Sequence, residues 1–211
     1  MTIGLILTNA AVWILYELPH LTRAVGSQSF YPCRVDSACH LGHPWPVAAL
    51  TSMFMHGSWE HIIGNMLFLW IFGNNVEDAM GRAKFLVFYL LSGFVATALQ
   101  TFVTLEFASH AAARIPNLGA SGAISGVLGA YFLLLPRARV LTFVFFFLVE
   151  VPAMWFLGVW FLFQLLASGG SVLHSSSGGG VAFFAHVGGF AFGLATVYLF
   201  VGRQRPLAPR Y

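Results

Sequence analysis

The chain has 211 residues, of which 58% are hydrophobic and only 8% are charged. A water-soluble fold of this length could not bury so much apolar surface, so the composition excludes a soluble globular protein and indicates an integral membrane protein. The net charge of +3 is not gathered in a dense basic run. We therefore expect the lipid bilayer as a partner and no nucleic acid.

Apolar segments along the chain approach the roughly 20 residues that a membrane-spanning helix needs. Nothing ahead of the first segment resembles a cleaved signal, so we expect this segment to be retained as a signal-anchor. The pattern predicts an all-α polytopic membrane protein, a six-helix bundle forming a single domain over residues 1–211. The six predicted spans are residues 3–18, 54–76, 84–105, 118–135, 151–168 and 181–201.

Two connections in this scheme differ from simple loops. The first, residues 19–53, contains four prolines and both cysteines and is too polar and broken to span, so we expect it to lie along the membrane interface. Cys33 and Cys39 could form a disulfide or remain two free thiols, and both readings stay open. The phenylalanine-rich piece 140–149 is either interfacial or an irregular start to the fifth span.

Positive charge predicts the orientation of the spans. Seven lysines and arginines fall on the side that holds both ends of the chain, and three fall on the other side. This places both termini in the cytoplasm, with residues 202–211 as a cytoplasmic tail and residues 19–53 outside. The compact form favours a prokaryotic inner membrane, with an organelle as the alternative. The seven are Arg82, Lys84, Arg137, Arg139, Arg203, Arg205 and Arg210, and the three are Arg23, Arg34 and Arg114.

Several polar residues then fall at a similar depth inside the predicted spans. At a rise of about 1.5 Å per residue, Ser121, Asn65 and His186 lie of the order of 5 to 10 Å below the outer surface. Unpaired polar groups are costly in hydrocarbon, so these residues and His61 should face the bundle interior and pair with one another. His61 and Asn65 are four residues apart and share one helix face.

These residue types fit one chemistry. A serine hydroxyl beside an imidazole is the minimal activated nucleophile, which assigns Ser121 and His186 to a dyad. His61 and Asn65 supply donors that could stabilise the oxyanion of a tetrahedral intermediate. We find no carboxylate at the depth of His186 that would orient its ring.

Each feature also has an ordinary explanation when taken singly. A serine in a membrane helix usually bonds to its own backbone, and small-residue stripes such as Gly122 with Gly126 and Gly189 with Gly193 are common packing devices. Intramembrane histidines also serve proton-coupled transport, but this chain lacks an acidic relay and an inverted repeat. A zinc site would lack a carboxylate or cysteine to complete it. We therefore expect no metal and no cofactor.

Three stretches together resemble the rhomboid family of intramembrane serine proteases. They are the run from Leu50 to Gly73, the Gly119-Ala-Ser-Gly122 motif and the Ala185-His-Val-Gly-Gly189 motif, which follow in order over residues 44–193. The resemblance implies a rhomboid-like bundle and an endopeptidase that cuts transmembrane protein substrates near the outer membrane face. The alternative is a catalytically silent relative that binds transmembrane clients.

The resemblance also implies a role for individual residues. Ser121 would be the nucleophile and His186 the base, while His61, Asn65 and the Ser121 backbone N–H would form the oxyanion site. His56 would support the cavity, and Gly119 belongs to the nucleophile motif. The sequence departs from some relatives at three places: Ser125 stands where a tyrosine stacks on the histidine, Val181 stands where many relatives have glycine, and Pro44-Trp45-Pro46 lies near the place of a tryptophan-arginine pair.

Two segments next to these motifs suggest how access to the site is controlled. The glycine- and serine-rich stretch 168–180 could cover the site as a lid, or it could be a plain connector. The aromatic residues Trp155, Phe156 and Trp160 of the fifth span could form a lateral gate.

Overall fold

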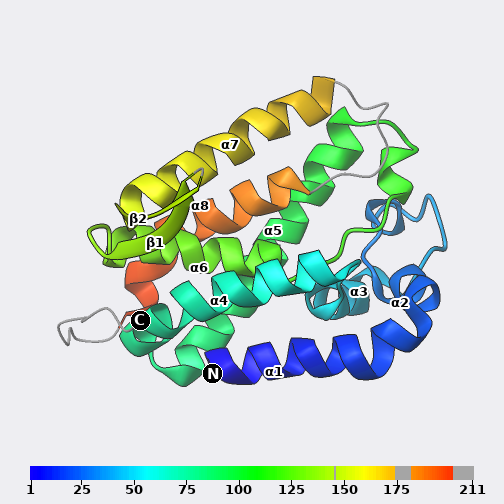
Figure 1. Cartoon of the computed structure of the whole chain (residues 1–211). Helices are drawn as coiled ribbons and strands as arrows, with labels where there is room; N and C mark the ends of the chain where they lie inside the picture. Colours follow the sequence, from blue (N-terminus) through cyan, green and yellow to red (C-terminus); the bar gives the residue numbers. More distant parts are fainter. Residues whose placement is uncertain (145, 174–181, 202–211) are drawn as a thin grey trace.

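The computed structural model describes residues 1–144, 146–173 and 182–201. The predicted tail 202–211, Val181 and most of the predicted lid lie outside these residues. Helices dominate the described chain, and a single hairpin interrupts them (Figure 1). The helices are α1 (Thr2–Val12), α2 (Leu21–Gln28), α3 (Trp45–Thr51), α4 (Trp59–Met80), α5 (Arg82–Phe107), α6 (Ser121–Leu134), α7 (Ala153–Leu173) and α8 (Phe183–Phe200), and the strands are β1 (Arg139–Val144) and β2 (Phe147–Pro152).

Three helical stretches in the described chain are long and apolar enough to cross a membrane, judged by length and composition. They are Thr2–Gln28, Arg82–Phe107 and Phe183–Phe200, which match the first, third and sixth predicted spans. The helices α4, α6 and α7 coincide with the other three predicted segments, but α6 has only 14 residues. The structure is thus that of a helical membrane protein.

The ends of several predicted spans were wrong. The first helical path does not stop at residue 18, because a π-helical turn at Trp13–Glu17 and a short turn at Leu18–His20 carry it into α2. The helix α4 begins five residues later than predicted, at Trp59, because the Ser58 hydroxyl accepts a hydrogen bond from the His61 backbone N–H and caps the helix. His56 therefore lies before this helix.

The helix α7, which corresponds to the fifth predicted span, also differs from its predicted range. It starts at Ala153 and continues to Leu173, so the first residues of the predicted glycine-serine connection are helical. Glycine costs only about 1 kcal/mol relative to alanine inside a helix, so two adjacent glycines did not end this one.

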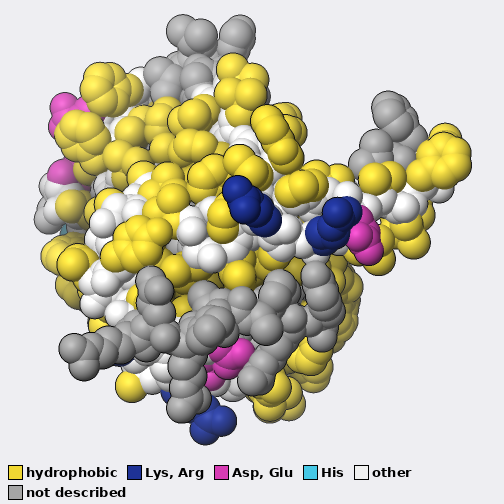
Figure 2. All heavy atoms as spheres, turned by 90° about the vertical axis from the view of Figure 1, so that its left-hand side faces the viewer, with side chains coloured by type: hydrophobic (Ala, Val, Ile, Leu, Met, Phe, Trp, Pro, Cys, Tyr) yellow, Lys and Arg dark blue, Asp and Glu magenta, His cyan; other side chains and the backbone are white. Residues whose placement is uncertain are grey.

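Residues 140–149, expected to be either interfacial or an irregular start to the fifth span, belong to a β-hairpin between the fourth and fifth predicted spans. Arg139 pairs with Pro152 at its base and Val144 with Phe147 near its turn. Branched and aromatic side chains favour such cross-strand pairing, and the Arg139 and Glu150 side chains add an ion pair at 3.5 Å. The hairpin projects from the body of the protein, with hydrophobic side chains on its exposed end (Figure 2).

The core is built around α6, which packs against α5, α8 and α4. Glycines bring α6 and α8 into backbone contact: a Cβ at Gly189 would lie 2.1 Å from the Gly122 carbonyl oxygen, and one at Gly193 would lie 2.1 Å from that of Gly126. The two small-residue stripes predicted from sequence do meet. Their contact joins α6, which begins at Ser121, to α8, which carries His186.

The long connection 29–58 anchors the loop that precedes α6. Phe30 and Asn117 exchange backbone hydrogen bonds at 2.9 and 2.8 Å. Cys33 and Cys39 form a disulfide, which resolves the alternative that the sequence left open. The range 19–53, which the sequence predicted to lie along the membrane interface, contains α2 and α3.

Candidate active site

Ser121 is the first residue of α6, and the turn before it is unusual. Gly119 has a φ of +123°, a conformation that residues with a side chain rarely adopt. Its backbone N–H donates to the Ser52 carbonyl oxygen at 2.9 Å. A helix start has N–H groups without intrahelical partners, so the turn presents both the hydroxyl and the backbone N–H of Ser121.

The structure brings Ser121 and His186 together across 65 residues of sequence. The His186 Nε2 atom lies 2.8 Å from the Ser121 Oγ atom. His186 lies in the first turn of α8 and is only 7% exposed. A serine hydroxyl and an imidazole in hydrogen-bond contact have the arrangement that the sequence predicted for a nucleophile and its base.

A third member of this group, Gln164 on α7, was not predicted from the sequence. Its Oε1 atom lies 2.9 Å from the His186 Nδ1 atom, on the far side of the imidazole from Ser121. The Trp160 ring, one turn earlier, lies over the same imidazole with ring centroids 5.9 Å apart. A glutamine inside an apolar span was the available signal, because polar groups there usually have a specific partner.

Ser125, which stands where some relatives have a tyrosine, does not replace that stacking ring. Its hydroxyl donates to the Ser121 carbonyl oxygen at 2.7 Å. The aromatic support of His186 comes from Trp160 instead, on a different helix.

His61 and Asn65 line the same cavity as the serine and histidine, from the α4 side. The cavity has a volume of about 580 Å³. The Asn65 Nδ2 atom is buried and has no hydrogen-bond partner within the described residues, so a donor is available there. Lining residues come from α4, the loop before α6, α6, α7 and α8: Glu60, His61, Gly64, Asn65, Phe68, Pro116, Asn117, Leu118, Ser121, Ile124, Ser125, Leu128, Trp160, Gln164, Ala182 and His186.

The His61 ring points toward the nucleophile turn. Its Nδ1 atom accepts the Gly57 backbone N–H at 3.5 Å, which leaves the proton on Nε2. A Cβ at Gly119 would lie 2.6 Å from that Nε2 atom and 3.6 Å from the Ser121 Oγ atom. The absent side chain of Gly119 therefore lets the His61 N–H approach the serine.

His56 packs behind His61 and does not line the cavity. The two rings meet edge to face, with centroids 5.0 Å apart, and His56 is fully buried. The His56 backbone N–H donates to the Glu17 Oε1 atom at 2.7 Å, a buried carboxylate that the sequence analysis did not consider. Burial, and to a lesser extent the neighbouring His61, lowers the pKa of His56 to about 3, so its ring is neutral.

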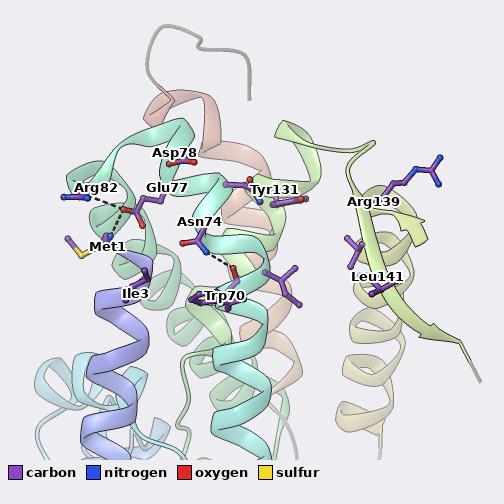
Figure 3. A pocket seen from close by; sticks show the side chains of 13 residues that line it. Met1, Ile3, Trp70, Asn74, Glu77, Asp78, Arg82, Tyr131, Arg139 and Leu141 are labelled. Carbon is purple, nitrogen blue, oxygen red and sulfur yellow. Dashed lines mark hydrogen bonds and ion pairs between the residues drawn. The ribbon is translucent and has the colours of Figure 1, made fainter. Parts of the chain in front are cut away.

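A second cavity of about 580 Å³ lies at the other end of α4 (Figure 3). Glu77 lies on its wall, where its Oε2 atom accepts the Thr2 backbone N–H at 2.6 Å. The Arg82 and Arg139 side chains extend away from one another, so they do not clamp a common anion. The described residues that line it include no serine, histidine or cysteine. The predicted chemistry thus belongs to the first cavity.

Comparison with known proteins gives relatives over most of the chain. Rhomboid protein 1, mitochondrial, of Saccharomyces cerevisiae is 31% identical over 186 residues, 88% of this chain and 49% of the yeast protein. The bovine presenilin-associated rhomboid-like protein, mitochondrial, is 30% identical over 136 residues, 64% of this chain and 33% of its own length. The chain therefore spans half or less of the length of these curated relatives.

These relatives overturn the expected location. A prokaryotic inner membrane was predicted, but the yeast and bovine proteins are mitochondrial, and a chloroplastic rhomboid-like protein of Arabidopsis thaliana matches over 46% of this chain at 31% identity. The matches point to membranes of eukaryotic organelles. Chain compactness was a poor guide, because it reports how many helices are present and not which membrane holds them.

The sequence pattern of the Rhomboid domain matches residues 43–203, a range that includes all three motifs and every residue of the candidate site except the buried Glu17. Together with the 31% identity to the yeast protein, this match establishes that the chain belongs to the rhomboid family.

Proposed function

We propose that the protein is an intramembrane serine endopeptidase that cleaves transmembrane segments of other membrane proteins. The observation that carries this proposal is the 2.8 Å contact between the His186 Nε2 atom and the Ser121 Oγ atom. It lies in a cavity that also presents two polar side chains from α4. Family membership adds support, but it does not by itself establish catalysis.

In the proposed reaction, the Ser121 Oγ atom attacks the scissile carbonyl carbon while His186 Nε2 takes the hydroxyl proton. The carbonyl oxygen becomes an oxyanion, which the Ser121 backbone N–H and the His61 Nε2–H would stabilise, with Asn65 Nδ2–H as a further donor. The C–N bond then breaks, and His186 returns its proton to the leaving amine. Water hydrolyses the resulting acyl-enzyme by the same steps and frees Ser121.

We also propose that the chain forms one membrane domain with six spans, α4, α6 and α7 crossing beside the three longest apolar helices. The site would lie on the side of the bundle where α6 and α8 begin. Both chain ends would lie on the opposite side, which holds more arginine and lysine. A transmembrane substrate would then be cut near the end of its span that faces the site, where helix-breaking or small residues help its backbone unwind.

Access would occur between α4 and α7. Phe156 is the gate residue that the structure supports best, because its ring packs against Phe68 and Phe72 of α4 at centroid distances of 6.3 and 6.2 Å. Trp155 is 64% exposed and faces away from such a closure. Most of the predicted lid lies outside the described residues, so tethering that segment remains the test of a lid.

The alternative is a silent family member that binds transmembrane clients without cutting them. The contact between Ser121 and His186 favours the protease, because a client-binding protein needs neither group. A proton-coupled transporter or a zinc site is a further alternative from the same histidines, and inhibition by a metal chelator would indicate the latter.

The direct test is cleavage of a single-span substrate in liposomes, beside folded Ser121→Ala and His186→Ala variants. We expect cleavage by the wild type, none by either variant, and fluorophosphonate labelling at Ser121 alone. An inert wild type that takes up no fluorophosphonate would favour client binding.

A further inference from the structure

Gln164 contacts the proposed base at the atom opposite the nucleophile. Its Oε1 atom lies 2.9 Å from the His186 Nδ1 atom, while Nε2 of the same ring lies 2.8 Å from the Ser121 Oγ atom. Gln164 is 6% exposed and His186 is 7% exposed, so little water competes for either contact. The imidazole is held at both nitrogens by protein groups.

The chemistry of an amide oxygen decides which ring nitrogen carries the proton. A carbonyl oxygen only accepts hydrogen bonds, so the contact with Gln164 requires a proton on His186 Nδ1. A neutral imidazole with its proton on Nδ1 has a lone pair on Nε2. That lone pair is what must accept the Ser121 hydroxyl proton.

We propose that Gln164 is a positioning residue that holds His186 in the reactive tautomer and orientation. This inference rests on the proposed function and extends it from a dyad to a Ser-His-Gln triad, in which Gln164 only positions the histidine. In this proposal Gln164 acts through the imidazole, by its contact with His186 Nδ1. The Trp160 ring, with its centroid 5.9 Å from that of His186, limits rotation of the imidazole away from this position.

The amide replaces the carboxylate that orients histidine in serine proteases with an aspartate. An amide fixes the tautomer but adds no negative charge for the imidazolium that forms during catalysis. Among the described residues lining the cavity, the other ionisable groups are Glu60 and His61, both on α4. On α5, the neutral Gln100 accepts the Ala185 backbone N–H at 3.2 Å and does not contact the imidazole in this way.

The test compares Gln164→Leu, Gln164→Glu and a matched control, Gln100→Leu, in liposomes with a single-span substrate. Leucine keeps the volume and removes the acceptor, so we expect kcat to fall on the order of 10- to 100-fold with KM changed less than about two-fold. Glutamate restores an acceptor and adds charge beside the ring. We expect it to recover most of kcat and to move the acid limb of the pH profile up by about one unit.

The control separates positioning from packing. Gln100→Leu also removes a partly buried amide beside α8, but we expect it to leave the acid limb where it is in the wild type. A folded Gln164→Leu protein with wild-type kcat would overturn the proposal, as would a Gln164→Glu protein with the activity loss and pH profile of the leucine variant.

A second measurement does not depend on activity. In ¹⁵N-histidine NMR spectra, the His186 signals, identified by their loss in His186→Ala, should report a proton on Nδ1 in the wild type and a tautomer mixture in Gln164→Leu. An inert wild type with the expected Nδ1–H signal would defeat the proposed function and leave the role of Gln164 intact. An Nε2–H tautomer in the wild type would defeat the inference directly.

Discussion

The two sides of His186 are built in different ways. On one side, α8 meets α6 through backbone: a Cβ added at Gly129 would lie 2.3 Å from the Phe190 carbonyl oxygen, and one at Gly193 would lie 2.1 Å from that of Gly126. On the other side, α7 meets the bundle through rings, with Phe161 stacked on Phe190 at a centroid distance of 4.3 Å. A Cβ at Gly158 of α7 would have only an ordinary contact, 3.9 Å from Phe132.

This difference separates α6 and α8, which are held in place, from α7, which can move. Backbones in contact have no side-chain rotamers with which to absorb a displacement, so α6 and α8 hold Ser121 and His186 in register. Aromatic side chains can rotate and repack at modest cost. In the proposed mechanism, α7 therefore carries both the group that orients His186 and the ring that closes the path from α4, and we expect it to shift most readily when a substrate enters.

The largest expected effect comes from adding a methyl group to the seam, the backbone contact between α6 and α8. Gly189→Ala should destabilise the protein by about 3 kcal/mol, because its Cβ would meet the Gly122 carbonyl oxygen and neither backbone can yield. Gly158→Ala, the same change on α7, should be neutral or slightly stabilising. Unfolding in detergent mixtures measures both. Equal stability of the two variants would mean that the seam is no tighter than the α7 contact.

The next largest effect concerns the turn before the nucleophile. Gly119→Ala should lower kcat by about 10²- to 10³-fold, because the new methyl group would displace the His61 ring and remove an oxyanion donor. Gly81→Ala is the matched control, since Gly81 also has a positive φ, of +80°, but nothing lies within 4 Å of an added Cβ. The control should lose stability and keep its kcat. Equal losses of kcat would show that backbone strain, and not the clash, is responsible.

A smaller effect is expected at the ring contact between α4 and α7. Phe156→Ala removes the ring that packs on Phe68 and Phe72, so cleavage of a transmembrane substrate should rise several-fold. Cleavage of a short soluble peptide should change little, because it does not enter between the helices. Trp155→Ala, a change at an exposed position of the same helix, is the control and should alter neither rate. An equal rise for both substrates would count against a gate.

The smallest effect on catalysis is expected from the disulfide. Reduction of the bridge between Cys33 and Cys39, which are six residues apart, should lower stability by about 2 kcal/mol and leave kcat unchanged. A Cys33→Ser, Cys39→Ser double variant should be as stable as the reduced wild-type protein, and its stability should not respond to reductant. A fall in kcat on reduction would show that the first connection acts on the site through its contact between Phe30 and Asn117.

Helix positions followed well from hydrophobicity, and helix ends did not. Apolar length predicted α5 to within two residues at each end. The helix α4 was displaced by a cap at Ser58, and α1 continued past residue 18 through a π-helical turn. Such ends depend on individual hydrogen bonds, which a hydropathy average does not resolve. The hairpin was missed for a related reason, because a phenylalanine-rich run suits a strand as well as an interfacial segment.

Within the candidate site, the residues predicted from the sequence are those that can be recognised from their neighbours in the chain or from helical spacing. Ser121 lies between glycines, and His61 and Asn65 share a helix face whatever the packing. The partner of His186 on α7 could not be derived in the same way, because nothing in a linear pattern says how far α7 rotates about its axis. Gln164 faces the imidazole from a helix whose Trp160 and Phe161 rings pack on Phe190 of α8.

The sequence by itself determined that the chain is a helical membrane protein, because composition and helical spacing are local properties. It also indicated which polar residues must find partners inside the protein, because burial of an unpaired polar group is costly in any fold. Only the tertiary structure gave the geometry of the predicted pair, Ser121 with His186, and the contacts that the sequence did not predict: His186 with Gln164, and the His61 N–H beside Gly119. Those pairings depend on the rotation and separation of helices, which are set by backbone contacts between residues far apart in the chain.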